Sequence, residues 1–429
     1  MAYRNWGFWD NPFGTDPLPP TEHGSKLLVG RDEVLRNIKR RLDNSSKIVT
    51  VEGLNGVGKT SVVNVMAYRA FSETLRTGIG PLYVPCRKPF QLSVDVDADE
   101  FRLSVLREVA QTLIECHAEI PPPPGRTRTT NNTALDRFLN SPQVKSFSGS
   151  LLQFGLGYSS ETNTGSGFEK SGFEKAVLDW LEQIFPTSTS GGVVCIIDNL
   201  ELLQTCQNAR DALERLRDSL FSVRGVRWVL CGALGIVHGV ASSPRLDGKL
   251  HKPVVVEDLD EKFAGEIFDN RIRAFRDSRS SKLPLSRSQF IEIYDIMRGN
   301  LRSVLSECDD FCMWVSDRVE ERDEFEDDFF EAWLAEELET AFYSVRSELR
   351  PRALEVFETA CQFEVFSPSD CEVFGYETPN AMRQQIRNLE AVGLLKSAVD
   401  ESDKRRKSIQ VTSKGWKVRA YLDFFEDSF

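Results

Sequence analysis

Eight residues near the N-terminus have the types and the spacing needed to hold a row of phosphates. Gly53 to Thr60 form the pattern G-x-x-x-x-G-K-T directly after the apolar run Ile48–Glu52. In this pattern the glycines let successive backbone N–H groups point at phosphates, Lys59 reaches the outer phosphates as a positive charge, and the Thr60 hydroxyl ligates Mg²⁺. The sequence therefore predicts a site for ATP and Mg²⁺. The residues expected around the phosphates are Asn55, Gly56, Val57, Gly58, Lys59, Thr60 and Ser61.

A second part of this site is predicted where a continuously apolar run ends at Asp198. A carboxylate in that position, combined with a phosphate loop, holds Mg²⁺ opposite Thr60. The next residue is Asn199, whose amide can orient a water molecule but cannot accept its proton. Glu201 is the nearest carboxylate and is our candidate for the hydrolytic base. Slow hydrolysis is therefore one expectation.

The composition limits the class of protein. The chain has 429 residues, so two or three domains are expected, and its net charge of −12 means that any nucleic-acid contact requires a local basic surface. Nine cysteines without a C-x-x-C pair, and only four histidines, argue against a disulfide framework or a zinc site and favour a reducing cytoplasm. The sequence has no apolar run of 18 residues, so no membrane partner is expected.

Apolar strands alternate with helical segments along much of the chain, which predicts an α/β fold with a doubly wound parallel sheet. The expected strands after the phosphate loop include 82–84, 192–198, 226–232 and 253–256. Four parts are predicted, and the second contains a glycine-rich insertion at about 125–172 that reads as a β-hairpin or a disordered loop. They are an extended N-terminal arm at 1–26, a P-loop ATPase core at 27–257, a helical lid and connector at 258–345, and a winged-helix domain at 346–429.

The N-terminal arm contains four prolines among four large aromatic residues, which forbids a continuous helix. Two roles are possible for its aromatic side chains. They pack on the protein's own core, or they contact another subunit or partner.

The C-terminal region has the order of elements expected of a winged helix. Helices are predicted at 352–362, from Ser367, and from Thr378 to Gly393, followed by a β-wing at 394–399 and 408–412 and a last helix at 414–424. Residues 377–419 contain ten Lys and Arg against five Asp and Glu, a net charge of +5. Duplex DNA is one expected partner, since in winged helices the third helix enters the major groove and the wing touches phosphates; protein docking is the alternative. The candidate DNA-binding residues are Arg383, Gln384, Arg387, Lys404, Arg405, Arg406 and Lys407.

Taken in order, these motifs resemble those of AAA+ ATPases, and most of all the archaeal origin-recognition-like initiators and the related STAND signalling ATPases. The resemblance covers about residues 27–310. It implies that Val29, Gly30 and Arg31 contact adenine and ribose. It also implies that Arg302, in Gly299-Asn300-Leu301-Arg302, reaches the γ-phosphate from the lid, and that Arg245 acts as an arginine finger on a neighbouring subunit. The polar residue that such ATPases carry after the strand 226–230 is absent, since Cys231 and Gly232 stand there.

Three functions follow from these features. The first is an oligomeric ATPase switch that engages DNA, as replication or transposition initiators do. The second is a STAND-like switch that assembles and activates a separate effector protein. The compact size of this chain and its glycine-rich insertion resemble those of ATPase components of bacterial antiviral defence or mobile-element operons. The third is a scaffold that is stabilised by nucleotide and does not hydrolyse it, which Asn199 and Cys231 favour.

Overall fold

The computed structural model describes residues 2–44, 47–121, 139, 170–203, 206–234, 245–246, 248–277, 280–319, 325–326, 328–363, 365–400 and 406–425. Most of the expected insertion at 125–172 lies outside these ranges, as do Lys404 and Arg405. In the part of the chain that the structure describes, no helix is long and apolar enough to span a bilayer.

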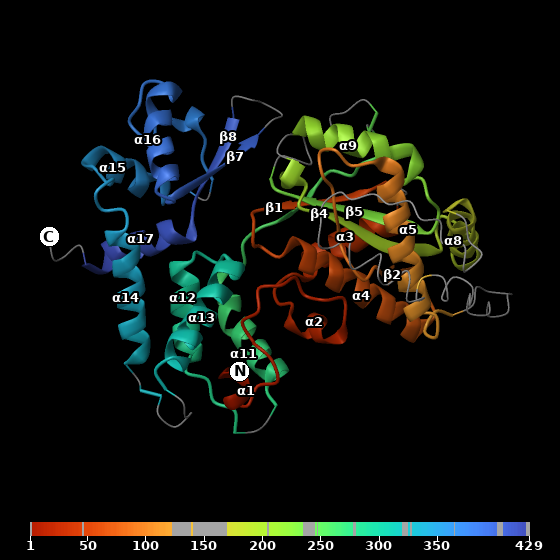
Figure 1. Cartoon of the computed structure of the whole chain (residues 1–429), viewed down its shortest axis with the longest axis horizontal. Coiled ribbons are helices and arrows are strands. Elements are labelled where there is room, and N and C mark those ends of the chain that lie inside the picture. The colour runs from red at the N-terminus through yellow and green to blue at the C-terminus, as the bar shows by residue number, and fades with distance from the viewer. Residues whose placement is uncertain are drawn as a thin grey trace.

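A parallel sheet forms the centre of the molecule, as the sequence predicts (Figure 1). Its strand order is β2-β4-β5-β1-β6, and β3 also pairs with β4. The two-residue strand β3 was not predicted, because so short a strand has no readable alternation. The strands are β1 (Val49–Gly53), β2 (Leu82–Pro85), β3 (Phe90–Gln91), β4 (Gly191–Asp198), β5 (Val226–Gly232) and β6 (Val254–Val256).

Helices cover both faces of the sheet, which explains why its strands are apolar throughout. In β4, Val194 and Ile196 pack with the helices of one face, whereas Val193, Cys195 and Ile197 pack with those of the other. The first face is covered by α3 (Asp32–Asn44) and α4 (Lys59–Thr77). The second face is covered by α5 (Ala98–Glu115), α8 (Lys170–Ile184) and α9 (Cys206–Ser219).

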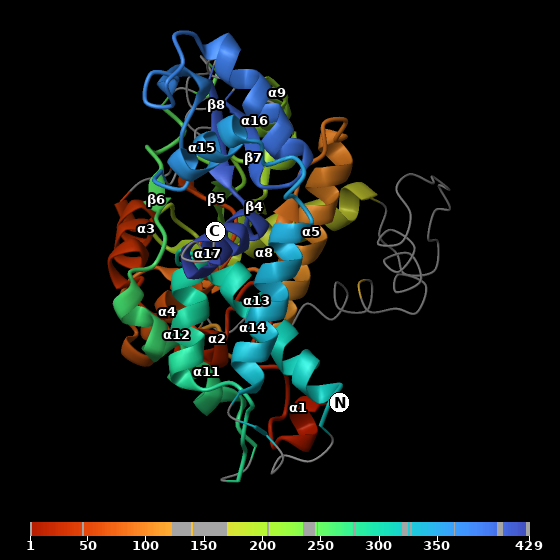
Figure 2. The same cartoon turned by 90° about the vertical axis from the view of Figure 1, so that its left-hand side faces the viewer.

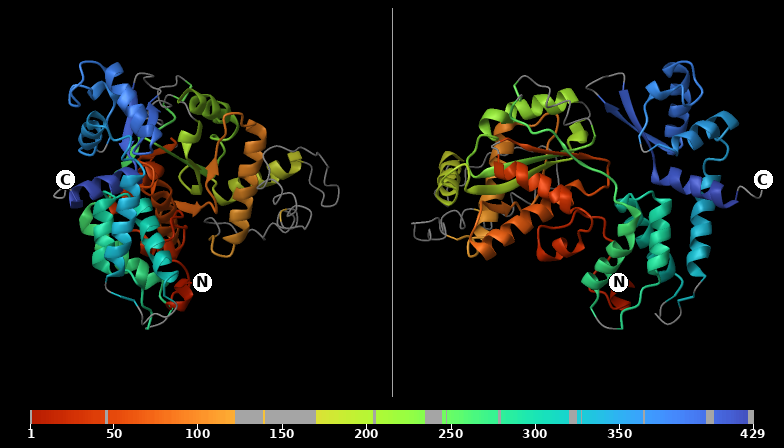
Figure 3. Two further views of the ribbon diagram at one scale, coloured as in Figure 1. Left: turned by 60° about the vertical axis from the view of Figure 1, so that its left-hand side comes forward. Right: turned by 180° about the vertical axis from the view of Figure 1, so that it is seen from behind.

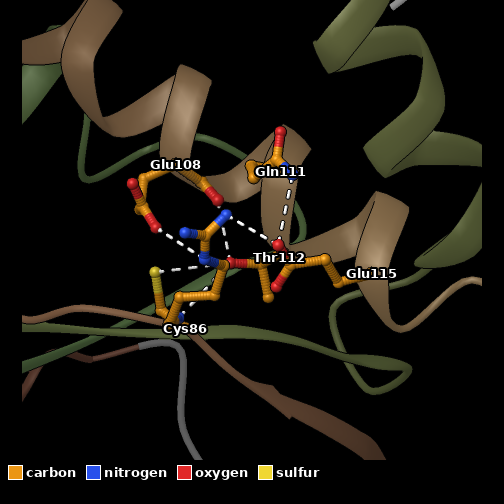
Figure 4. Close-up of polar contacts among 6 residues, drawn as sticks. Cys86, Glu108, Gln111, Thr112 and Glu115 are labelled. Carbon is orange, nitrogen blue, oxygen red and sulfur yellow. Dashed lines mark hydrogen bonds and ion pairs between the residues drawn. The ribbon is translucent and has the colours of Figure 1, made fainter. Parts of the chain in front are cut away.

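Polar contacts fix the carboxyl end of β2 on α5. The guanidinium of Arg87 forms ion pairs with Glu108 at 3.3 Å and with Glu115 at 2.8 Å. The Thr112 hydroxyl donates to the sulfur of Cys86 at 3.8 Å, within the same group of side chains (Figure 4). This edge of the sheet is thus held by side chains as well as by the β2–β4 ladder.

The helices predicted to form a lid, called the lid below, follow β6 and lie beside the sheet (Figure 1). The turn η2 (Glu261–Phe263) leads into α11 (Ala264–Phe275), α12 (Arg287–Ile296) and α13 (Leu301–Ser316), and α14 (Phe329–Tyr343) connects the lid to the C-terminal unit. Phe330 and Trp333 of α14 are buried in the same apolar cluster as the lid helices. Helix α14 therefore packs on the lid.

The N-terminal arm packs on the protein's own lid. Trp6, Phe8 and Phe13 are buried in the apolar cluster of the lid, and the Tyr3 hydroxyl donates to Asp309 at 2.6 Å. The arm contains two short helices, α1 (Ala2–Asn5) and α2 (Glu22–Leu27), where the sequence predicted an extended segment. The Thr21 side chain caps α2, a local signal placed after the last proline of the arm.

The C-terminal unit has the predicted sequence of elements with one correction. It contains α15 (Pro351–Ala360), α16 (Pro379–Ala391), the antiparallel pair β7 (Leu395–Asp400) and β8 (Arg406–Val411), and α17 (Ser413–Phe425). The helix predicted from Ser367 is wrong, because only the 3₁₀ turn η4 (Pro368–Asp370) forms there. Ser367 and Asp370 cap each other, and a capping box marks the start of a turn without fixing its length.

Candidate nucleotide site

The phosphate loop joins β1 to α4 at the carboxyl edge of the sheet, where ligands bind in folds of this kind. Gly56 and Gly58 have φ values of 93° and 89°, in a region that side chains disfavour, so both positions require glycine. Helix α4 starts at Lys59, and the partial positive charge of its N-terminus attracts anions. The loop and helix thus have the backbone geometry of the phosphate-binding loop that the sequence predicts, and their role toward phosphate stays a prediction.

Lys59 and Thr60 lie inside this loop. Lys59 is only 7% exposed, and its Nζ donates to the carbonyl oxygens of Gly53 and Leu54, both at 3.0 Å. Burial lowers the pKa of Lys59, while the negative charges of Glu201 and Asp198 act to raise it. A buried ammonium beside flexible glycines can exchange weak carbonyl contacts for charged phosphate oxygens.

Asp198 reaches Thr60 directly across the sheet edge. The Thr60 hydroxyl donates to Asp198 Oδ2 at 2.6 Å, and the Asp198 residue is 6% exposed at the end of β4. A hydroxyl and a carboxylate brought together in this way are the oxygen ligands that Mg²⁺ prefers. The donor set therefore fits Mg²⁺, whose contribution would be to neutralise charge on a transferring phosphoryl group.

The chain turns sharply after Asp198. Asn199 has a φ of 55°, a left-handed conformation that asparagine tolerates better than most residues, and it leads into η1 (Leu200–Leu203). The turn brings Glu201 to β5, where its Oε2 accepts the Ala233 N–H at 3.1 Å. Glu201 thus lies just beyond the carboxyl ends of β4 and β5, with one carboxylate oxygen already engaged.

Arg31 connects the expected adenine-binding box to the phosphate loop. Its buried guanidinium donates to the Val57 carbonyl at 3.1 Å, a contact that the sequence did not reveal. Gly30 has a φ of 70°, and a Cβ on it would lie within 3 Å of Phe263 and Leu259. Val29 is buried among lid residues. Gly30 thus lies against the segment that follows β6. The role of all three residues toward adenine stays a prediction.

The lid reaches the phosphate loop through the start of α13. The Asn300 side chain caps α13 and donates to the Asn55 carbonyl at 2.9 Å. A Cβ on Gly56 would lie 3.1 Å from Arg302 Cβ, and the charge of Arg302 acts on Lys59. The structure thus brings Arg302 to the site. It also adds Asn300, which the sequence placed only as a member of the motif around Arg302.

Arg245 lies elsewhere, on the side of α9. It is exposed over 58% of its side chain and forms an ion pair with Glu214 at 3.7 Å, while its carbonyl accepts from Arg217. An arginine on an outer face suits action on a neighbouring subunit, which stays a prediction.

The candidate DNA-binding residues are divided between α16 and the hairpin. Gln384 and Arg387 are exposed on α16, and Arg383 is half-buried and bonded to Asn380. The buried face of α16 consists of Met382, Ile386 and Leu389, whereas Ala381 is exposed. The backbones of Arg406 and Lys407 open β8, and Lys404 and Arg405 lie outside the described residues.

Fold and loop together define an α/β fold of the P-loop ATPase type. No protein-family model and no curated protein matches this sequence.

Solved structures do show similarity to the chain. A Walker-type ATPase of Pyrococcus abyssi has 13% identity and a TM-score of 0.46, with 95% of this chain and 99% of that chain covered. The ORC2 protein of Aeropyrum pernix in its ADP form has 12% identity and a TM-score of 0.47, with coverage of 98% and 99%. The ORC1 protein of the same organism in complex with DNA has 15% identity and a TM-score of 0.41, with coverage of 95% and 97%.

Proposed function

We propose that this chain is an ATP-binding and ATP-hydrolysing switch that assembles into oligomers and engages duplex DNA through its C-terminal unit. The observation that carries the ATPase proposal is the direct hydrogen bond between Thr60 and Asp198 beside the buried ammonium of Lys59. A hydroxyl, a carboxylate and a cation placed together at a helix N-terminus match the requirements of phosphoryl transfer from ATP.

Each residue then has a defined task. Lys59, from the loop, and Arg302, from the lid, would neutralise charge on the outer phosphates. Thr60 and Asp198 hold Mg²⁺. Glu201 positions the attacking water with its second carboxylate oxygen, because the first accepts the Ala233 N–H. The turn at Asn199 and the apolar position of Cys231 supply no second base, so we expect slow hydrolysis without a neighbouring subunit.

A trans-acting role for Arg245 predicts loss of turnover with retained ATP binding in Arg245→Ala. Turnover is expected to fall about 10³-fold, the lower end for a missing arginine finger. The measurement is phosphate release together with ATP affinity. The matched control is Arg215→Ala, since Arg215 is an exposed arginine of α9, the helix beside which Arg245 lies.

Mixing the inactive variants Arg245→Ala and Lys59→Ala separates action in trans from a structural defect. The Lys59→Ala subunit still carries Arg245 and can complete the site of its neighbour, so the mixture is expected to regain turnover. Mixtures without any recovered activity would contradict the finger proposal.

DNA engagement rests on the net charge of +5 in residues 377–419 and on the exposed face of α16. The double variant Lys404→Glu/Arg405→Glu is expected to weaken binding to a duplex and to flatten its salt dependence by about 0.9 per lost phosphate contact. The measurement is fluorescence anisotropy of a labelled duplex at several salt concentrations. Arg36→Glu/Arg40→Glu on α3 makes the same change in net charge away from the hairpin.

A second candidate function is activation of a partner protein without DNA. It is favoured by the packing of α17 on the lid helices, since a C-terminal unit held on the nucleotide domain can be released by a change of nucleotide. An ATPase that turns over ATP but binds no duplex at low salt would replace the DNA proposal with this one.

A further inference from the structure

A chain of hydrogen bonds connects the phosphate loop to the C-terminal unit. Asn300 Nδ2 donates to the Asn55 carbonyl at 2.9 Å, and Ser303 Oγ donates to Asn300 Oδ1 at 3.1 Å. Ser303 Oγ and Ser413 Oγ are 2.7 Å apart. Asn55 belongs to the phosphate loop, Asn300 and Ser303 to the start of α13, and Ser413 is the first residue of α17.

The protons of this chain have one consistent direction. Asn300 must present its NH₂ group to the Asn55 carbonyl, so its oxygen faces Ser303. The Ser303 hydroxyl has a single proton and gives it to that oxygen, so the proton between the two serines belongs to Ser413. Every bond then donates toward the phosphate loop, an arrangement in which neighbouring hydrogen bonds strengthen one another.

The hydrogen-bonded residues pack tightly where they meet the phosphate loop. A Cβ on Gly56 would lie only 2.6 Å from Asn300 Oδ1, so Asn300 packs closely on the loop backbone. A change in the loop on binding phosphates must therefore move Asn300 or break its contacts.

The other end of this series of hydrogen bonds, at α17, is also held by several contacts. Lys417 of α17 forms ion pairs with Glu307 of α13 at 2.8 Å and with Glu337 of α14 at 2.7 Å. Arg298 lies over the ring of Trp416, 5.4 Å from its centroid. Helix α17 accordingly lies against the lid in the views of Figures 2 and 3. The first turn of α17 faces the start of α13, so a shift of one helix moves the other.

We infer that Ser303 and Ser413 are positioning residues that couple the state of the phosphate loop to the docking of the C-terminal unit. The inference rests on the proposed nucleotide binding and names the contact through which that binding is regulated. Loss of the bond between Ser303 and Ser413 frees the start of α13 from α17. Because this part of α13 carries Asn300 and Arg302, nucleotide is then held less well. Because coupling is reciprocal, nucleotide in turn tightens α17 on the lid.

The test is a double-mutant cycle on the ADP affinity of the full chain, measured by calorimetry. Ser303→Ala and Ser413→Ala are each expected to raise the Kd about fivefold, the lower end of typical coupling. The double variant is expected to raise it no further, because both changes cut the same bond. Ser344→Ala is the matched control, since its hydroxyl bond of 2.7 Å to the Ala341 carbonyl is local to the C-terminal end of α14. Ser413→Thr keeps the hydroxyl and is expected to restore the affinity.

Hydrogen exchange of residues 413–418 supplies a second readout that a purely structural role would not move. ADP is expected to slow this exchange in the wild type and to leave it unchanged in Ser303→Ala. If one alanine variant fails to fold, the other variant and the exchange measurement still decide.

Two results would overturn the inference alone. The first is an unchanged Kd for ADP in Ser413→Ala. The second is a Kd in the double variant that rises by the product of the two single effects. In both cases Lys59→Ala must abolish ADP binding. A wild-type chain that binds no ADP would instead overturn the proposed function, and this inference with it.

Discussion

Replacing Lys59 with alanine is expected to abolish ATP turnover and to raise the Kd for Mg-ATP at least about 100-fold. Lys59 is buried at the start of α4, where its ammonium faces the loop carbonyls of Gly53 and Leu54. Charge-assisted hydrogen bonds contribute about 1.5–3 kcal/mol each, and two to the outer phosphates account for the expected loss. Calorimetry with Mg-ATP measures the affinity, and phosphate release measures turnover.

Lys88→Ala is the matched control for this change. Lys88 is an exposed lysine just beyond β2, so its removal is expected to leave affinity and turnover within about twofold, as is usual for surface substitutions. The thermal midpoint of both variants shows that the fold is kept. An ATP affinity within threefold of the wild type in Lys59→Ala would show that the loop does not bind phosphates as proposed.

The strands that place this site were predictable because each is apolar along its whole length. In β4, alternate residues face α4 on one side and α5 on the other, and only a sheet covered on both faces permits that. The helix expected from Ser367 does not form, because the signal for it covers only a few residues. Its capping signal is local, and the turn that follows is set by the packing of Phe366 and Phe374.

The site was predictable where a single motif contains it, as in the phosphate loop. The pairing of Asp198 with Thr60 was also predictable, because both belong to known motifs, but contacts between distant segments outside such motifs were not. Asn300 is 245 residues from Asn55, and Ser413 is 110 residues from Ser303. No periodicity connects such pairs, because their approach depends on how the lid and C-terminal unit pack. The pairing of Arg31 with the Val57 carbonyl has the same origin.

Trp6→Ala is expected to lower the free energy of unfolding by about 3–5 kcal/mol, the range for large aromatic side chains in a core. Trp6 is 2% exposed and packs edge-on against Tyr3 and Phe325, with ring centroids 5.5 and 5.6 Å away. Its loss opens a cavity between the N-terminal arm and the lid. Chemical denaturation followed by far-ultraviolet circular dichroism measures the effect.

Trp9→Ala provides a control of the same residue type three positions along the arm. Trp9 is 46% exposed and stacks on Phe275 at 4.9 Å, so its removal is expected to cost about 1 kcal/mol. The arm also reaches α4, where the Leu18 N–H donates to Ser61 Oγ at 3.0 Å, one residue after Thr60. Because one segment joins the lid to the phosphate-loop helix, Trp6→Ala is also expected to weaken ADP binding, whereas Trp9→Ala is not. Equal losses of stability in the two variants would contradict a structural role for the arm in holding the lid.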